Sequence, residues 1–563
     1  MLPHITFSAV FIPFYCDLEK GDGAMRKMLG QFARRLIQTE WISNLVEAIP
    51  GLRVWVNRML INSIVRSVRT RPHPWSTVYD YVSWRGLSDR TWSARHLQAS
   101  DKDVDALPDA DALTAMFARG DGPVRLCPKS TLLFPTFAQY LTDGFIRTKT
   151  DESDPDHLKR TTSNHQIDLC PLYGLNRDQT LALRVENPDR PQYGRLKSQL
   201  IGNEEFPPFL YAGDDVDPEF ENLDPPVGIE KLLVPCQNPD PAISGPARKR
   251  RGELFAVGGD RANSVPQVAM MNTLLLREHN RLAGEFVERN PDWNDDRVFE
   301  TARNVVIVEY IKIVVEEYIN HIAPLPFTIR ADPAAAWDAP WNKPNWITTE
   351  FSLLYRWHPL IPDQIQWGDK TYDVRRTFFN NGPLIDVGLA QGFTDMSRQP
   401  AGALGAFNTT KGLLDVEKAS ILQDRDCRLA PFVAYQDYIG RDRPKKISEI
   451  SSNPEVVALL DSLYKGEVED VEYFIGLFAE DRVENSPLPQ TILTMVAIDA
   501  FSQALTNPLL SKHVFKEETF SPYGWAQLNE VSTLADLLRR NVPDPQAIGQ
   551  IGMTRSDWRY GDE

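Results

Sequence analysis

The stretch "TLLLREHNRLAGEF", residues 273–286, decides the fold class. Its leucines lie within a helical pattern of apolar residues that predicts one helix over 265–289. Five consecutive polar residues at 277–281, Arg-Glu-His-Asn-Arg, interrupt this otherwise apolar helix. Since buried polar groups need hydrogen-bonding partners, the stretch predicts a core helix that carries an internal polar network.

The same periodicity recurs along the chain. Helices are predicted over 133–148, 297–322, 347–358, 453–463 and 487–509. Alternation with a period of two, typical of half-buried strands, is rare. The sequence therefore predicts a mainly α fold.

Composition and charge exclude several classes of protein. Of the 563 residues, 42% are hydrophobic and 25% charged, which indicates a globular chain, and 61 minus 77 gives a net charge of −16, which argues against a nucleic-acid partner. The five cysteines form no CxxC pair and favour a reducing compartment. The N-terminus lacks the basic region of a signal peptide, and no run of 18 apolar residues predicts a membrane span, so we expect a cytoplasmic protein.

Residues 25–73 differ from the rest of the chain. They hold nine Arg or Lys and two Glu, a local charge of 9 − 2 = +7, on short amphipathic helical patterns with Trp and Phe. This pattern is typical of helices that lie in the plane of an anionic membrane, and equally of a helical subdomain packed on the body. We predict an N-terminal membrane-binding segment, 1–72, and a catalytic domain, 73–563, with peripheral membrane association.

A second stretch, "LLYRWHPLIPD" at 353–363, places Tyr355 and His358 three residues apart. On a helix, positions i and i+3 share a face. The pair is either packed core, or the histidine holds a group that the tyrosine uses.

Both stretches, with "NHQIDLCPLYG" at 164–174, resemble the animal-type haem peroxidase superfamily, most closely its cyclooxygenase and fatty-acid dioxygenase branch. The resemblance covers roughly residues 40–545, from "WISNLVEAIPG" through "FAQYLTDGFIRT" to "NEVSTLADLLRRNV". It implies the helical peroxidase fold and a bound haem b.

The resemblance implies separate roles around that haem. His358 is the proximal iron ligand, and the neighbouring Trp357 helps to keep the site dry. Tyr355 becomes the radical that abstracts hydrogen from a fatty acid, and Tyr318 in "EEYINHIAPL" hydrogen-bonds it. The alternative for Tyr355 is a buried tyrosine with a satisfied hydroxyl.

Three further positions match the substrate channel of cyclooxygenases. Arg69 in "VRSVRT" matches the arginine that binds the substrate carboxylate, although it could equally be a solvated or headgroup-bound arginine. Leu325 replaces a tyrosine at the channel constriction and removes one polar partner for that carboxylate. Ser502 falls near a channel serine, with a small core residue as the alternative.

The distal side departs from the family. Gln139 matches the distal glutamine, but Asp143 stands at the position of the distal histidine. Either peroxide cleavage is crippled or retuned, or Asp143 works with a distal arginine. The candidate is Arg261 in "GGDRANSVP", which would polarise the O–O bond or pair with a haem propionate.

Other positions bear on the cofactors. Thr142 and Ser264 replace the two acidic residues that esterify haem in mammalian peroxidases, so we expect noncovalent haem. Gly144 replaces a calcium-ligating aspartate, although Asp168 remains, so calcium is not favoured. Ser420 matches the asparagine that hydrogen-bonds the proximal histidine in those enzymes.

The resulting hypothesis is a haem dioxygenase that adds O2 to a long-chain unsaturated fatty acid, with peroxide as activator and a hydroperoxide as product. One alternative is a peroxidase that oxidises small reductants without oxygenating fatty acids. Another is a haem-binding pseudoenzyme. A homodimer stays open.

Overall fold

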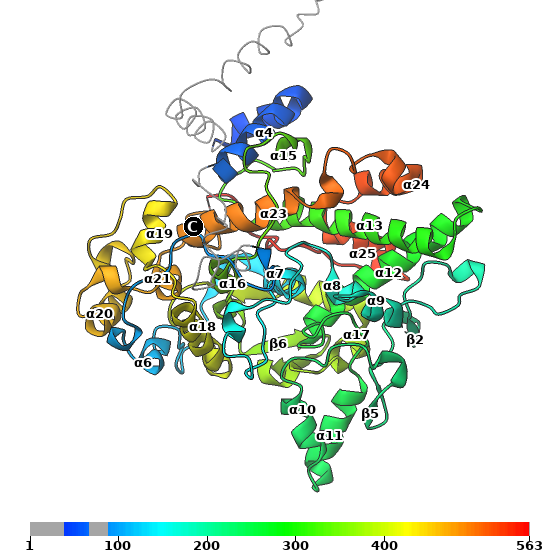
Figure 1. The fold of residues 1–563 in the computed structure, drawn as a ribbon, viewed down its shortest axis with the longest axis horizontal. Helices are drawn as coiled ribbons and strands as arrows, with labels where there is room; N and C mark the ends of the chain where they lie inside the picture. The colour runs from blue at the N-terminus through cyan, green and yellow to red at the C-terminus, as the bar shows by residue number, and fades with distance from the viewer. Residues whose placement is uncertain (1–38, 67–87, 562–563) are drawn as a thin grey trace, which may run out of the picture.

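The computed structural model describes residues 39–66 and 88–561, and it is mainly helical, as predicted. The core is built on α12 (Pro266–Arg289), which begins with a proline at its first turn, where a missing N–H costs no hydrogen bond. Helices α7 (Leu133–Phe145), α13 (Asp295–Ile313) and α17 (Gly382–Arg398) pack on it. Figure 1 shows α12 and α13 running beside one another, with α7 and α16 near the middle of the molecule.

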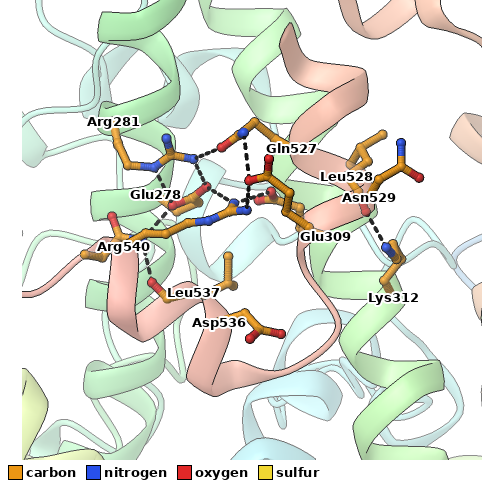
Figure 2. A network of polar contacts seen from close by, with 12 residues as sticks. Glu278, Arg281, Glu309, Lys312, Gln527, Leu528, Asn529, Asp536, Leu537 and Arg540 are labelled. Carbon is orange, nitrogen blue, oxygen red and sulfur yellow. Dashed lines mark hydrogen bonds and ion pairs between the residues drawn. The ribbon is translucent and has the colours of Figure 1, made fainter. Parts of the chain in front are cut away.

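The polar network predicted within α12 is present. Glu278 is fully buried and accepts hydrogen bonds from Arg281 and Asn541. Arg540 extends the network, because its Nη1 lies 3.5 Å from Glu278 Oε1 and 3.3 Å from Glu309 Oε1 (Figure 2). Buried charges are tolerated when they are paired in this way, and here the pairing ties α25 (Leu534–Arg540) to α12 and α13.

The other helices surround this core. They are α6 (Ala110–Thr114), α8 (Cys170–Tyr173), α9 (Arg177–Leu183), α10 (Glu230–Cys236), α11 (Pro241–Gly252), α15 (Ala334–Trp337), α18 (Leu414–Asp426), α19 (Phe432–Tyr438), α20 (Pro454–Leu463), α21 (Tyr473–Ala479) and α24 (Glu517–Glu530). Helices α10 and α11 project from the end of the molecule opposite α4 (Figure 1).

Strands in the described part of the chain form only two-stranded antiparallel pairs. These pairs are β1 (Leu126–Thr131) with β8 (Pro400–Gly402), β2 (Gln199–Ile201) with β3 (Glu204–Phe206), β4 (Tyr211–Ala212) with β5 (Asp215–Val216), and β6 (Gln364–Trp367) with β7 (Lys370–Asp373). The scarcity of period-two alternation in the sequence agrees with this.

Two predicted helices contain π-helical segments. The helix predicted over 297–322 is α13, then the π-helix η6 (Val314–Ile319), then α14 (Asn320–Ile322). The helix predicted over 487–509 is α22 (Gln490–Val496), the π-helix η12 (Ala497–Phe501) and α23 (Ser502–Leu505). Such segments are frequent at functional sites, and η6 carries Tyr318.

The helix predicted over 347–358 is too long at its C-terminal end. Helix α16 covers Thr349–Leu354, and its N-cap Thr348 accepts a hydrogen bond from the backbone N–H of Phe351. Pro359 disfavours the helical conformation at the residue before it, and His358 instead opens a short 3-10 turn, η7 (His358–Leu360). Tyr355 and His358 therefore do not share the face of one helix.

The predicted N-terminal segment contains α3 (Glu40–Ala48) and α4 (Pro50–Arg66); residues 1–38 and 67–72 lie outside the described residues. Ser43 and Asn57 donate to the backbone oxygens of Pro326 and Arg330, and α4 lies beside α15 (Figure 1). The two helices and the residue between them also expose large apolar side chains: Trp41, Leu45, Ile49 and Val54. Among the described helices, none combines the length and the hydropathy that a membrane-spanning helix requires.

Candidate active site

The site begins where α16 ends. Tyr355 forms the C-cap of α16. The backbone N–H of Trp357 donates a hydrogen bond of 2.9 Å to the backbone oxygen of Tyr355. The Tyr355 and Trp357 rings stack with centroids 4.6 Å apart. His358 follows, with its side chain one-fifth exposed. This turn keeps the three side chains together although they leave the helix.

The structure brings Tyr318 and Tyr355 together. The Tyr318 hydroxyl donates a hydrogen bond of 3.0 Å to the Tyr355 hydroxyl. Burial raises the pKa of Tyr355 above its usual value, although the Tyr318 hydrogen bond opposes this shift. Both phenols therefore stay protonated at neutral pH. The contact expected from the sequence is present, whereas the radical role stays a prediction.

Aromatic rings enclose this pair. Phe134 of α7 packs on Tyr318 with centroids 5.7 Å apart and on Trp357 at 5.3 Å. Phe351 meets the Tyr355 ring edge-on at 5.0 Å. The phenols thus face few polar groups besides one another.

Gln139 and Asp143 lie on one face of α7, four residues apart. The Gln139 amide donates to Ser264 Oγ at 3.2 Å. Burial raises the pKa of Asp143 to about 7, against the opposing effect of Arg261. Arg261 donates to the backbone oxygen of Thr148 at 3.2 Å. The structure therefore brings Arg261 within electrostatic reach of Asp143.

Two charged residues at this site were missed by the sequence reasoning. Arg356 lies between Tyr355 and Trp357, and its pKa falls to about 10 through burial and then repulsion by Arg261. Asp260 forms an ion pair with Arg147 at 2.9 Å. A charged residue inside the aromatic stretch 355–358 was the available signal for Arg356.

Several buried polar atoms at the site make no well-aligned hydrogen bond to any described residue. They are Asp143 Oδ2, Arg356 Nε, Trp357 Nε1, His358 Nδ1 and Glu417 Oε2. Native proteins leave few such atoms, and a cluster of them points to a polar ligand.

The structure describes two of the three proposed channel residues, Leu325 and Ser502. Arg69 lies outside the described residues. Leu325 is half-buried against the core, just before Pro326, which contacts α3. Ser502 is fully buried, and its hydroxyl donates to the backbone oxygen of Ile498 in the preceding segment, η12. That hydroxyl is thus already used by the backbone.

Another buried cluster escaped the sequence analysis. His96 Nε2 lies 2.8 Å from Asp499 of η12, and its Nδ1 lies 2.9 Å from the Tyr438 hydroxyl. Asp499 is close enough to Tyr355 to raise its pKa. The partners are hundreds of residues apart along the chain, so no local pattern could reveal them.

Known proteins resemble this chain in sequence. Prostaglandin G/H synthase 2 of Equus caballus is 28% identical over 511 residues, covering 89% of this chain and 78% of the relative. Prostaglandin G/H synthase 1 of Mus musculus is 29% identical over 477 residues, covering 82% and 73%.

Solved structures share the fold. A fatty acid alpha-dioxygenase of Oryza sativa superposes with a TM-score of 0.67 at 15% identity, covering 97% of this chain and 99% of its own. Peroxidase A of Dictyostelium discoideum gives a TM-score of 0.62 at 17% identity, covering 87% and 96%. Both likenesses describe the fold alone.

A family model described as animal haem peroxidase matches residues 137–551, more than half of the chain. That span contains Gln139 and Asp143, the Tyr318–Tyr355 pair and His358. The chain belongs to the animal haem peroxidase family.

Proposed function

We propose that this protein is a haem-dependent dioxygenase that converts a long-chain unsaturated fatty acid and O2 into a fatty-acid hydroperoxide. The observation that carries the proposal is the hydrogen-bonded pair Tyr318–Tyr355, enclosed by aromatic rings and three residues from His358. A tyrosine that only fills the core does not require this combination.

The residues present fit a haem. His358 would hold the iron, because an imidazole is a standard axial ligand and the side chain is one-fifth exposed. Trp357, with Phe134 packed against it, supplies an apolar environment next to His358. Arg356 and Arg261 supply positive charge for its propionates, and the unpaired Arg356 Nε is suited to such an acceptor. When bound and activated by peroxide, haem supplies a one-electron oxidant.

Tyr355 then carries the oxygenation chemistry. Loss of one electron and one proton makes it a neutral radical, and Tyr318 keeps its hydrogen bond to the phenoxyl oxygen. The radical takes a hydrogen atom from an activated C–H bond of the fatty acid, which restores the phenol and leaves a carbon radical. O2 adds to that carbon. The resulting peroxyl radical takes the hydrogen atom back from Tyr355, which yields the hydroperoxide and regenerates the tyrosyl radical.

Asp143 would handle the proton of the activating peroxide. Its pKa of about 7 leaves a substantial carboxylate fraction at neutral pH, so an aspartate can serve where a histidine was expected. Arg261 is placed to stabilise that carboxylate. These features favour a distal side in which Asp143 works with Arg261 over one in which peroxide cleavage is crippled.

The relatives and the N-terminal helices support a lipid substrate. The relatives include prostaglandin G/H synthases, and one solved structure of the Oryza sativa fatty acid alpha-dioxygenase contains palmitic acid. Helix α4 packs beside η12, which holds Asp499 close to Tyr355. Peripheral contact of α3 and α4 with a membrane would bring such a substrate to the site.

The same distal residues favour a second candidate, a peroxidase that oxidises small reductants. An oxygen-electrode assay with a panel of fatty acids, with and without peroxide priming, separates the two. We expect peroxide-primed oxygen uptake with at least one polyunsaturated fatty acid. Peroxide-dependent dye oxidation with no oxygen uptake on any fatty acid would select the peroxidase, and haem binding without either turnover would select a pseudoenzyme.

A further inference from the structure

Glu417 is a buried carboxylate that contacts the proposed iron ligand. It lies in the first turn of α18, and its side chain is fully shielded from solvent. Its Oε1 is 3.2 Å from Nδ1 of His358. Ser420, the position expected to support this histidine, instead donates its hydroxyl to the backbone oxygen of Val416 at 2.9 Å. The carboxylate one turn earlier on the same helix therefore lies beside Nδ1.

Burial of this carboxylate needs compensation. Thr409 donates its hydroxyl to Oε1 at 2.9 Å, and the positive end of the helix dipole favours an acid in the first turn of α18. Arg356 adds a positive charge within electrostatic reach. Even so, Oε2 of Glu417 has no hydrogen-bond partner among the described residues. The carboxylate can therefore accept a further hydrogen bond.

Nδ1 of His358, in turn, lacks a well-aligned hydrogen-bond acceptor. Nδ1 of His358 is buried and lies within ion-pair distance of Oε1, but its N–H is not aimed squarely at that oxygen. Coordination through Nε2 would hold the ring in one orientation with the proton on Nδ1, which is how metal-bound histidines usually engage a carboxylate.

We propose that Glu417 is a positioning residue that accepts a hydrogen bond from Nδ1 of His358 and makes this imidazole a more electron-donating ligand. The inference rests on the proposed function, since it takes His358 as the ligand of the haem iron. A carboxylate partner fixes the tautomer, so that the Nε2 lone pair is free for the metal, and it raises the basicity of the ring. The stronger donor stabilises the ferric over the ferrous state.

The test compares haem-loaded Glu417→Gln with the matched control Asp415→Asn. Both substitutions remove one negative charge in the first turn of α18, but Asp415 is exposed. The readouts are the ferric–ferrous reduction potential and the iron–histidine stretching frequency of the ferrous protein. We expect Glu417→Gln to shift the equilibrium at least tenfold toward the ferrous state, about 59 mV for a one-electron couple, and to lower the stretching frequency. Values equal to those of Asp415→Asn would overturn the inference.

Two further variants make the outcome decisive. Thr409→Val removes the hydroxyl that orients Glu417 and should shift both readouts in the same direction by a smaller amount. If Glu417→Gln does not fold, Thr409→Val decides alone, and unchanged readouts there overturn the inference. His358→Ala should abolish the iron–histidine vibration. Its persistence would refute the ligand assignment, and with it the proposed function, whatever Glu417 does.

Discussion

Tyr318 donates a 3.0 Å hydrogen bond to Tyr355 from a π-helical segment, η6, that interrupts a long α-helix. A π-helical segment changes which side chains face the core, and here it presents Tyr318 to the end of α16. The pair therefore depends on two local departures from regular helix, the π-turn at Tyr318 and the helix end at Tyr355.

Tyr318→Phe should weaken oxygenation without abolishing it. The substitution removes a hydrogen bond of about 1 kcal/mol and leaves the Tyr355 hydroxyl with one partner fewer. We expect an altered electron paramagnetic resonance spectrum of the tyrosyl radical and a several-fold loss of oxygen uptake. A spectrum identical to that of the unaltered protein would show that the bond does not persist in the radical.

Peroxide-dependent turnover should depend on pH through Asp143. The folded-state pKa is raised to about 7, so the basic carboxylate form is present above pH 7 and is lost as pH falls through that value. Activity should fall about tenfold per pH unit below the midpoint.

Two variants test this assignment. Asp143→Asn should remove most of the activity. It should also eliminate the acid limb of the pH profile, which is the fall in activity below pH 7. Arg261→Gln should move the midpoint to higher pH, because the arginine lowers the pKa of Asp143. An acid limb that persists unchanged in Asp143→Asn would assign the titration to another group.

Arg540→Ala should destabilise the fold far more than Arg539→Ala. Arg540 is mostly buried between Glu278 and Glu309, and breaking a buried ion pair costs about 3–5 kcal/mol (Figure 2). Arg539 is exposed, and its pair with Asp536 is worth at most about 1 kcal/mol. Urea unfolding of the two variants measures the difference, and equal midpoints would refute the stabilising role of the network.

Replacement of Trp41 and Leu45 by serine should release the protein from anionic lipid vesicles. The two side chains are 68% and 54% exposed and lie four residues apart on one face of α3. Their burial in lipid is worth about 3 kcal/mol together, so binding should weaken roughly a hundredfold. Leu200→Ser, a change at another exposed leucine, on β2, is the control. Equal binding of both variants in a sedimentation assay would exclude α3 as the contact.

The sequence predicted those parts of the fold that rest on local pattern. The helix over 265–289 was placed to within one residue, because its apolar periodicity is long and a proline marks its start. The end of α16 was misplaced, since the pattern continues through Trp357 although Pro359 disfavours helix before it. The π-helical segments hardly change the spacing of the apolar residues, so this spacing could not predict them.

The candidate site was predictable where a residue lies in a characteristic stretch. Tyr318 and Tyr355 could be named from their surroundings, and the structure places their hydroxyls in contact. Glu417 could not, because its partner His358 is distant along the chain and its helix offers no local sign of a buried acid. Asp499 and His96 were missed for the same reason.

The most direct test of the central claim is oxygen uptake with linoleate by Tyr355→Phe. Tyr310→Phe is the control, because Tyr310 is also a buried phenol but has no hydrogen-bond partner among the described residues. We expect Tyr355→Phe to keep the haem absorbance spectrum and to lose oxygen uptake entirely, while Tyr310→Phe retains it. Undiminished uptake by Tyr355→Phe would contradict the radical role of this tyrosine.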